Sequence, residues 1–308
     1  MPGEGGARLR HRLLSRCEFP APGTAVDCAV SGGPDSLSLL VLAVTAGCAV
    51  TAWHVDHGLR RGSETEADVV AAAAARFGAR FRAVRAPVPA GPNLEDRARR
   101  ARLGALPAGV LTGHTADDQA ETLLLAILRG AGVDGLTGMG PDRHPLLGLR
   151  RADTEALCAE EDLTAVRDAT NAELVQVRNR VRHQLLPLAA EIAGRDLVPL
   201  LTRTAALLRA DAEVLAAAAA SVDPTDARAL AAAPPASARR AVRAWLVAAT
   251  PARAPAYPPT LAAVERVLAV ARGEAIACEV AGVGRVARHR QRLVIEGPPA
   301  PAPIACGP

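Results

Sequence analysis

The stretch AVDCAVSGGPDS, at residues 25–36 of 308, limits the possible folds of this chain more than any other. Its first half is apolar enough for a buried strand, and the segment DSLSLLVLAVTAG that follows has the length and apolar content of a helix. Glycines at the end of a parallel strand let the backbone turn tightly, so that amide N–H groups and the positive end of the next helix point at one spot. The sequence therefore predicts a phosphate-binding turn at the edge of a parallel sheet.

The polar side chains of this turn suit a nucleotide and a metal ion. Serine hydroxyl groups can donate hydrogen bonds to phosphate oxygens, and Asp35 can hold a Mg²⁺ ion that shields the phosphates. The turn is not a GxxxxGKS or GxxxxGKT loop, because the chain contains no lysine, and it is not GxGxxG. The structural alternative is an ordinary glycine turn with a serine helix cap. The predicted nucleotide-binding residues are Ser31, Gly32, Gly33, Pro34, Asp35 and Ser36.

Strands and helices continue to alternate along the first half of the chain. Further strands are predicted at residues 50–60, 81–88 and 109–114. Helices are predicted at residues 35–47, 62–78, 93–106 and 116–130. This alternation predicts an α/β fold with a doubly wound, Rossmann-like parallel sheet that has helices on both faces.

The composition changes after Gly130. Residues 130–151 are rich in glycine and turn residues, which favours a mobile active-site loop over a packed element. Beyond them the sequence predicts one long helix from Leu197 to Ala220, two more helices, and two or three short strands near the end. We therefore expect a first domain at residues 1–190, a helical linker at 191–220, a smaller, mainly helical domain at 221–297, and a disordered tail at 298–308.

Charge is distributed unevenly between the two parts of the chain. From Arg195 onward there are 14 arginines and 9 acidic residues, whereas the first 194 residues carry 22 arginines and 23 acidic residues. A positive C-terminal part suits a phosphate-rich partner, although solvated structural charge gives the same count. No apolar run is long enough for a membrane span, and the six cysteines form no CxxC pair. We expect a soluble, cytoplasmic protein with reduced thiols.

Several motifs resemble those of one enzyme family. SGGPDS resembles the SGGxDS loop of PP-loop, or N-type, ATP pyrophosphatases, which adenylate a substrate and release pyrophosphate. HVDHGLR at residues 54–60 and GHTADDQAETLLLAILRGAGVDGL at 113–136 resemble elements of the tRNA(Ile)-lysidine synthetase family. So do the Arg-rich stretch at 95–103, where Leu103 replaces the usual aromatic residue, and the elements between 145 and 182, where Thr170 replaces a serine. The resemblance covers residues 25 to 190.

The resemblance implies a reaction and its participants. ATP with Mg²⁺ would adenylate the wobble cytidine of a tRNA(Ile) that has a CAU anticodon, and the ε-amino group of free L-lysine would then displace AMP. A homodimer is the family expectation. The implied roles are adenine and ribose binding for His54, lysine or metal binding for Asp118 and Glu121, contact with the activated base or phosphates for His114 and Arg99, and substrate contact for Arg178.

The acidic residues after His114 also raise a question of charge. On a helix, Asp118 and Glu121 are three residues apart and share a face with Asp117. Like charges at this spacing disfavour a helix unless a cation offsets them, and we expect that cation to be Mg²⁺ or a cationic substrate. The alternative is that they are acids at a helix N-terminus that complement its dipole.

Other functions stay open at this stage. A related PP-loop tRNA thiolase would need paired cysteines, and an amidating relative would need a glutamine-hydrolysing domain or an ammonia source. A catalytically inactive RNA-binding relative is the candidate from a different class. In each lysidine-forming or RNA-binding case, the C-terminal part is expected to bind the body of the tRNA. The arginines predicted to do so are Arg209, Arg239, Arg240, Arg243, Arg285, Arg288, Arg290 and Arg292.

Overall fold

The chain forms two compact units. The first consists of residues 1–209 and the second of residues 210–308. The computed structural model describes residues 4–56, 63–88, 94–166, 177–250 and 259–296. The boundary between the units falls within the helix α10 (Val198–Ala220). Each unit has its own apolar core. No helix in the described ranges is both long and apolar enough to cross a membrane.

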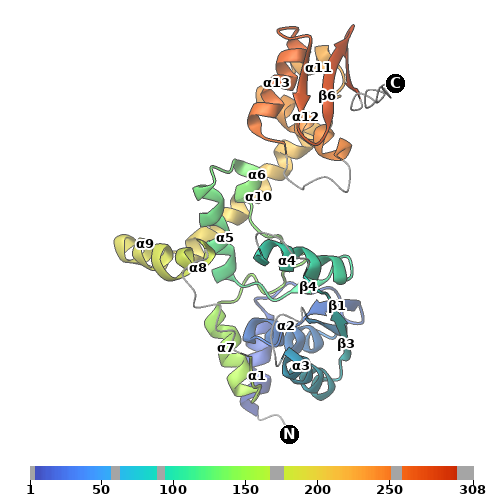
Figure 1. Ribbon diagram of the computed structural model, residues 1–308. Coiled ribbons are helices and arrows are strands. Elements are labelled where there is room, and N and C mark those ends of the chain that lie inside the picture. Colours follow the sequence, from blue (N-terminus) through green and yellow to red (C-terminus); the bar gives the residue numbers. More distant parts are fainter. Residues whose placement is uncertain (1–3, 57–62, 89–93, 167–176, 251–258, 297–308) are drawn as a thin grey trace, which may run out of the picture. The chain divides into compact units, whose positions relative to one another are not determined.

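The first unit is built on a sheet that has four strands in the described part of the chain (Figure 1). They are β1 (Ala25–Ala29), β2 (Ala49–Asp56), β3 (Arg80–Arg85) and β4 (Leu111–Thr112). Their order is β3-β2-β1-β4, and each neighbouring pair is parallel. The register places Cys28 of β1 beside Ala52 of β2 and Leu111 of β4, and all three side chains are buried. The predicted parallel sheet is therefore confirmed.

A helix follows each of these strands, as the alternation predicts. They are α2 (Pro34–Thr45), α3 (Ser63–Phe77), α4 (Leu94–Ala105) and α5 (Ala116–Leu128). The chain crosses the sheet in one direction from β1 to β3 and then returns past β1 to β4. Because crossovers between parallel strands are right-handed, α2 and α3 cover one face and α4 the other. The connections diverge at the carboxyl ends of β1 and β4, where sheets of this kind bind their ligands.

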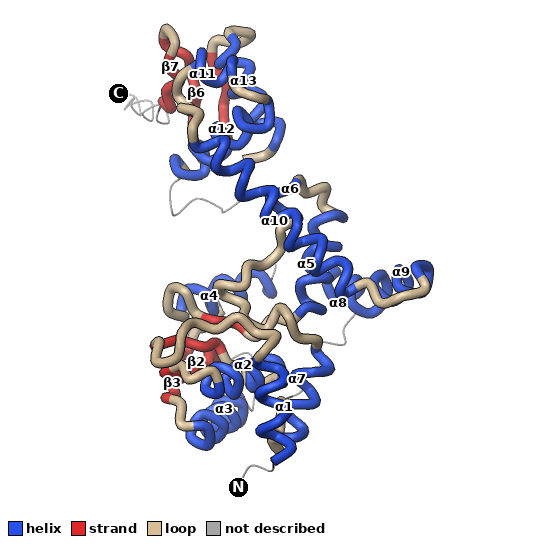
Figure 2. Tube along the Cα trace, turned by 180° about the vertical axis from the view of Figure 1, so that it is seen from behind, coloured by secondary structure: helices blue, strands red, loops and turns tan. Residues whose placement is uncertain are grey.

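Several helices lie where the sequence predicts none. In the view of Figure 2, α1 (Glu4–Leu14) and α7 (Arg151–Glu160) lie beside α2, and the three helices contact one another. Leu13 of α1 and Leu157 of α7 are buried in the same core as α2, but charged and small residues surround them in the sequence and hide the helical period. The other unexpected elements are α8 (Val177–Arg180), the π-helical turn η2 (Val181–Leu185) and α9 (Leu186–Ala193).

The glycine-rich segment before α7 is more ordered than its composition suggests. It contains the short helix α6 (Val133–Leu136). The side-chain amide of Gln119 accepts a hydrogen bond from the Met139 N–H at 2.8 Å and donates one to the Met139 carbonyl at 3.1 Å. Leu146 and Leu149 are fully buried in the core of the first unit. The prediction of an unpacked loop is wrong for this end of the segment, because burial of the two leucines fixes the backbone between the glycines.

The second unit contains helices and short terminal strands, as predicted, and these strands form a small antiparallel sheet. The elements after α10 are α11 (Ala227–Ala232), α12 (Pro235–Ala249), α13 (Leu261–Arg272), β5 (Ala277–Val280), β6 (Gly284–His289) and β7 (Arg292–Glu296). In the described residues the sheet has the order β5-β6-β7. The core of this unit includes Val242 and Leu246 of α12, Val267 of α13 and Val286 of β6, all fully buried.

Gly113, which follows β4, allows the backbone there to contact the start of α2. A Cβ atom at this position would lie 2.5 Å from the carbonyl oxygen of Asp35 and 3.0 Å from the amide nitrogen of Ser36. We expect Gly113→Ala to lower the free energy of unfolding by about 1–3 kcal/mol, since backbone must move. Urea unfolding measures this. Gly104→Ala in α4 is the control, because a Cβ there meets nothing within 4 Å; equal stability of the two variants would contradict the prediction.

Candidate functional site

Residues 31–36 form a tight turn between β1 and α2 that leaves backbone donors available. Gly32 has a φ of +86°, a conformation that favours glycine. The Ser36 hydroxyl accepts a hydrogen bond from the Ser31 amide at 3.1 Å and donates one to the Gly33 carbonyl at 2.9 Å. No side chain caps α2, and none of the described residues accepts a hydrogen bond from the amides of Gly32 and Gly33. The turn can therefore donate these N–H groups to a phosphate.

Asp35 lies at the start of α2, partly withdrawn from solvent. Its side chain is 26% exposed, its Oδ1 accepts a hydrogen bond from the Thr154 hydroxyl, and its Oδ2 is 3.7 Å from Nε of Arg151. Burial raises the pKa of Asp35 to about 6, although Thr154 and Arg151 act in the opposite direction. The folded chain thus destabilises the ionised form of this carboxyl group, which a further cation would stabilise.

Asp118 contributes both to its own helix and to the site. Its Oδ2 accepts hydrogen bonds from the amide and the hydroxyl of Thr115, at 2.9 and 3.1 Å, so it caps the N-terminus of α5. Burial alone would raise the pKa of Asp118, but Arg151, the Thr115 amide, His114 and Arg178 together lower it. Asp118 therefore does stabilise the N-terminus of its helix, as the alternative explanation predicts, and it also contacts the other residues of the site.

Arginines of the same chain offset the carboxylates of α5. Nη2 of Arg151 lies 3.1 Å from Asp118 and 3.5 Å from Glu121. Arg178 contacts the same pair, at 3.3 Å from Asp118 and 2.8 Å from Glu121, whose side chain is only 2% exposed. Nε of Arg182 is 3.9 Å from Glu121. From the sequence we expect Mg²⁺ or a cationic substrate to offset the charge of these carboxylates. In the structure three guanidinium groups of the same chain offset it instead.

A second ion pair fixes the start of α7 against α5. Arg150 donates two hydrogen bonds to Asp117, both at 3.0 Å, and the Arg151 amide donates a third at 2.9 Å. Arg150 also pairs with Asp196. Burial would raise the pKa of Asp117, but its bonds from Arg150 and Arg151 lower it. This clamp holds the Arg151 side chain near Asp35 and Glu121.

Two histidines and a threonine form a polar cluster at the end of β4. The Thr112 hydroxyl lies 2.7 Å from Nδ1 of His114 and 2.6 Å from Nδ1 of His144, and the two nitrogens are 3.2 Å apart. The rings meet edge to face, with their centroids 4.9 Å apart. A hydroxyl group can accept from one ring and donate to the other, so the cluster couples the tautomers of the two histidines. His144 thus orients His114, which is one of the predicted site residues.

The structure brings together some of the predicted site residues and separates others. Asp35, Asp118, Glu121 and Arg178 meet around Arg151, and His114 lies close enough to Asp118 to lower its pKa. His54 is buried within the fold, where its Nδ1 lies 3.0 Å from the Val30 carbonyl oxygen. Its role beside a nucleotide stays a prediction. Arg99 lies on α4, but its side chain is outside the described part, as are residues 57–60 and 168–171.

Sequence reasoning gave no role to several residues that complete the site. Arg151 lies within the elements between 145 and 182 that resemble the family, but only its position opposite three carboxylates shows what it does. Thr154 follows it by one helical turn and binds Asp35. The sequence feature that could have indicated them is the pair Arg150-Arg151, which follows the apolar residues Leu146 and Leu147. Two adjacent arginines next to apolar residues that become buried need acidic partners.

Residues 9–189 match the protein family described as PP-loop domain, and residues 226–294 match the family described as TilS substrate binding domain. The tRNA(Ile)-lysidine synthase of Nocardia farcinica is 44% identical over 78% of this chain and 81% of that protein. The protein of the same name from Mycolicibacterium paratuberculosis is 43% identical, over 71% and 73% of the two chains. The one from Mycobacterium tuberculosis is 40% identical, over 71% and 74%.

Among solved structures, the chain is similar to the U34-tRNA thiolase NcsA from Methanococcus maripaludis. The TM-score is 0.51, with 15% identity over 67% of this chain and 80% of that chain. This likeness shows a shared fold.

The raised pKa of Asp35 predicts that Asp35→Asn stabilises the folded protein at high pH. The folded pKa is about 6 against an ordinary 3.8, so the folded state binds this proton more tightly and stability falls as pH rises through that window. Asparagine stays neutral, and we expect a gain of about 1–3 kcal/mol at pH 8 that disappears below about pH 4.

Urea unfolding of the first unit measures this gain. Trp53 lies in the first unit and Trp245 in the second, so a Trp245→Phe background reports the first unit alone by fluorescence. Asp142→Asn, at an exposed aspartate of the same unit, is the control and should change stability by less than about 0.5 kcal/mol. A gain that does not vary with pH would show that charge burial is not its cause.

Proposed function

Since the chain belongs to the tRNA(Ile)-lysidine synthase family, we propose that it is a ligase that forms lysidine on tRNA(Ile). In the first step ATP transfers AMP to the 2-oxygen of the wobble cytidine of a CAU anticodon, and pyrophosphate leaves. In the second step the ε-amino nitrogen of free L-lysine bonds to carbon 2, the bond from that carbon to the adenylated oxygen breaks, and AMP departs with the oxygen while the amine loses a proton. One carbon–nitrogen bond is formed for each ATP consumed.

The observation that supports this function best is the junction between the turn at residues 31–36 and α5. Arg151 reaches Asp35 at 3.7 Å and Asp118 at 3.1 Å, so the nucleotide turn and the acidic helix form one continuous polar site. It lies where β1 and β4 end side by side. An adenylation reaction needs this proximity, because the phosphate chain and the base that attacks it must meet in one place.

The turn would hold the phosphates of ATP, with Asp35 holding Mg²⁺. No group of three His, Cys, Asp or Glu side chains among the described residues could enclose a metal ion. A single carboxylate beside a phosphate-binding turn nevertheless fits Mg²⁺, which proteins often bind through one or two carboxylates together with the phosphates of the nucleotide. When bound, the ion would neutralise charge on the phosphates and on the departing pyrophosphate. The amides of Gly32 and Gly33 would orient the phosphate chain through their N–H groups.

The carboxylates of α5 would bind the lysine substrate. Asp118 and Glu121 already accept hydrogen bonds from Arg151 and Arg178, so the ammonium groups of lysine would share these oxygens with the arginines. Arg151 and Arg178 would in turn stabilise negative charge on AMP or pyrophosphate. His114, held by Thr112 and His144, would contact the activated base, and Arg99 its phosphates.

The available cysteines do not support tRNA thiolation. The five described cysteines, at positions 17, 28, 48, 158 and 278, are all free and form no disulfide. Burial raises the pKa of Cys17 and of Cys28 to about 12, so these thiols are poor nucleophiles at neutral pH. Sulfur transfer through a persulfide needs the opposite, an accessible thiol with a low pKa.

The remaining parts of the proposal concern the setting of the reaction. Residues 1–190 would carry catalysis, 191–220 would link the domains, and 221–297 would bind the tRNA. The enzyme would work in the cytoplasm, where tRNA and free lysine meet, and as a homodimer, in line with the family expectation. The match of residues 226–294 to the TilS substrate binding domain supports the tRNA-binding role of the second unit.

Many arginines of the second unit already have partners. Arg239 pairs with Glu265, Arg292 pairs with Asp223, and Arg288 donates to the Ala271 carbonyl at 2.7 Å. Arg285 lies 3.5 Å from Glu296. Arg290, by contrast, is exposed in the turn between β6 and β7, which makes it the clearest candidate for contact with a tRNA phosphate.

Arg290→Gln should therefore weaken tRNA binding and lower its dependence on salt. The slope of log Kd against log salt should fall by about 0.7–0.9, the value for one phosphate contact. Arg272→Gln is the matched control, since Arg272 pairs with Glu274 at 2.6 Å in the same unit. Fluorescence anisotropy with labelled tRNA at several salt concentrations measures both slopes. If Arg290→Gln leaves the salt slope unchanged, Arg290 does not contact a tRNA phosphate and is only solvated.

The decisive experiment supplies ATP, labelled lysine and a tRNA(Ile) transcript with a CAU anticodon. We expect label to join the RNA, with AMP and pyrophosphate released in equal amounts. A transcript with uridine at the wobble position should stay unlabelled. Asp35→Ala should lower ATP–pyrophosphate exchange by at least about 100-fold, because the phosphates lose the carboxylate that supports Mg²⁺. Consumption of ATP without labelled RNA would contradict the proposed function.

A further inference from the structure

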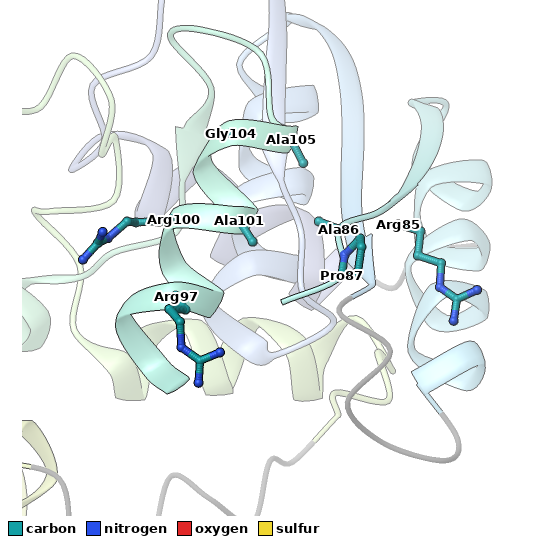
Figure 3. A pocket seen from close by; sticks show the side chains of 8 residues that line it. All are labelled: Arg85, Ala86, Pro87, Arg97, Arg100, Ala101, Gly104 and Ala105. Carbon is teal, nitrogen blue, oxygen red and sulfur yellow. The ribbon is translucent and has the colours of Figure 1, made fainter. Parts of the chain in front are cut away.

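An open hollow of ≈ 560 Å³ lies between the end of β3 and the helix α4 (Figure 3). Its cationic lining comes from Arg85 at the end of β3 and from Arg97 and Arg100 on α4. The rest of the lining consists of small apolar residues: Ala86 and Pro87 on the strand side, and Ala101, Gly104 and Ala105 on the helix. The volume falls within the range of small-molecule sites, and none of the described residues that line the hollow is acidic.

The sequence of α4 explains why the described side chains of this helix do not fill the space. Counting from Arg97, the lining residues of the helix stand at spacings of three, four, seven and eight, which is a single helical face. The face carries arginines near its start and only Ala101, Gly104 and Ala105 over the following turns. A Cβ at Gly104 would meet nothing within 4 Å. A packed interior would fill such a space with larger apolar side chains, so this face is not shaped for core packing.

The charge and shape of the hollow suit one nucleotide unit. In Figure 3 Ala86, Pro87 and Ala101 lie at the wall of the hollow, and the side chains of Arg85, Arg97 and Arg100 extend from its rim in three different directions. A guanidinium group can donate two parallel hydrogen bonds to a phosphate, and a base or ribose can lie against an apolar wall. Arg97 and Arg100 also interact with other groups of the chain, with which a phosphate would share them.

The position of the hollow relates it to the catalytic site. Its strand residues follow the carboxyl end of β3, at the same edge of the sheet as the turn at residues 31–36. β3 is two places from β1 in the sheet, which corresponds to a separation of about 10 Å. An RNA strand that crosses this edge could therefore occupy the hollow with one nucleotide while a nearby nucleotide reaches Asp35.

We propose that this hollow binds a nucleotide of the anticodon loop next to the base that is modified. This inference rests on the proposed function, since it takes the RNA substrate from there. The phosphate would bind Arg97 and Arg100, with Arg85 opposite, and the base or ribose would contact Ala101 and Pro87. The hollow is thus a positioning site for the substrate, separate from the turn that would hold ATP.

Removal of the two helix charges tests the phosphate contact. We expect the Arg97→Gln/Arg100→Gln double variant to raise the Kd for tRNA(Ile) at least about 10-fold and to lower the salt slope by about 1.4, since each single-strand phosphate contact contributes about 0.7. The Kd for ATP should stay unchanged. Arg80→Gln is the matched control, because Arg80 is an exposed arginine at the opposite end of the same strand. A double variant that binds tRNA as Arg80→Gln does would overturn the proposal.

A neutral steric change separates a true binding site from a general attraction by positive charge. Ala101→Leu fills the hollow without altering charge, and we expect it to weaken tRNA binding by at least about 5-fold with an unchanged salt slope. If charge alone matters, Ala101→Leu will bind tRNA as the wild type does, and the inference fails. Circular dichroism and ATP binding verify that each variant is folded.

The wild-type protein distinguishes this inference from the proposed function. Wild-type protein that neither binds tRNA(Ile) nor joins lysine to it would refute the proposed function, and with it this inference. If the wild type modifies tRNA and both sets of variants keep wild-type affinity, only the assignment of the hollow is wrong.

Discussion

Three carboxylates, one from α2 and two from α5, surround the guanidinium group of Arg151, and the geometry of the site depends on this balance of charge. Asp35, Asp118 and Glu121 lie 3.7, 3.1 and 3.5 Å from it. Without a cation between them, carboxylates this close would repel one another, and some would have to take up protons. The clamp between Arg150 and Asp117 keeps the cation in place, because it anchors the start of α7.

The pKa values of Asp35 and Asp118, which face Arg151 from different helices, are shifted in opposite directions. Burial raises the pKa of Asp35 to about 6, whereas the surrounding donors lower that of Asp118. A carboxylate that lacks enough positive charge gains most from a metal ion, and one that is already satisfied acts best as a fixed acceptor. This difference supports the proposed assignment of Asp35 to Mg²⁺ and of the α5 acids to the amine substrate.

The chain contains arginine but no lysine, and the structure separates the uses of its arginines. Arg151 and Arg178 balance buried acids, and Arg239 and Arg292 form ion pairs within the second unit. Such structural pairs count towards net charge but offer less to RNA than exposed groups do. The basic excess of the C-terminal part is therefore a poor guide to where this part would contact RNA.

The sequence by itself determined the parallel sheet, the turn at residues 31–36 and the family, because local period, glycine position and motif spacing are encoded along the chain. It also placed Asp118 and Glu121 on one helical face. Only the tertiary structure decided that Arg151 and Thr154 join Asp35, that His144 contacts His114, and that Leu146 and Leu149 order a glycine-rich segment. Those contacts join residues distant in sequence, and the packing of α7 against α2 and the pairing of β4 with β1, not any local preference, bring them together.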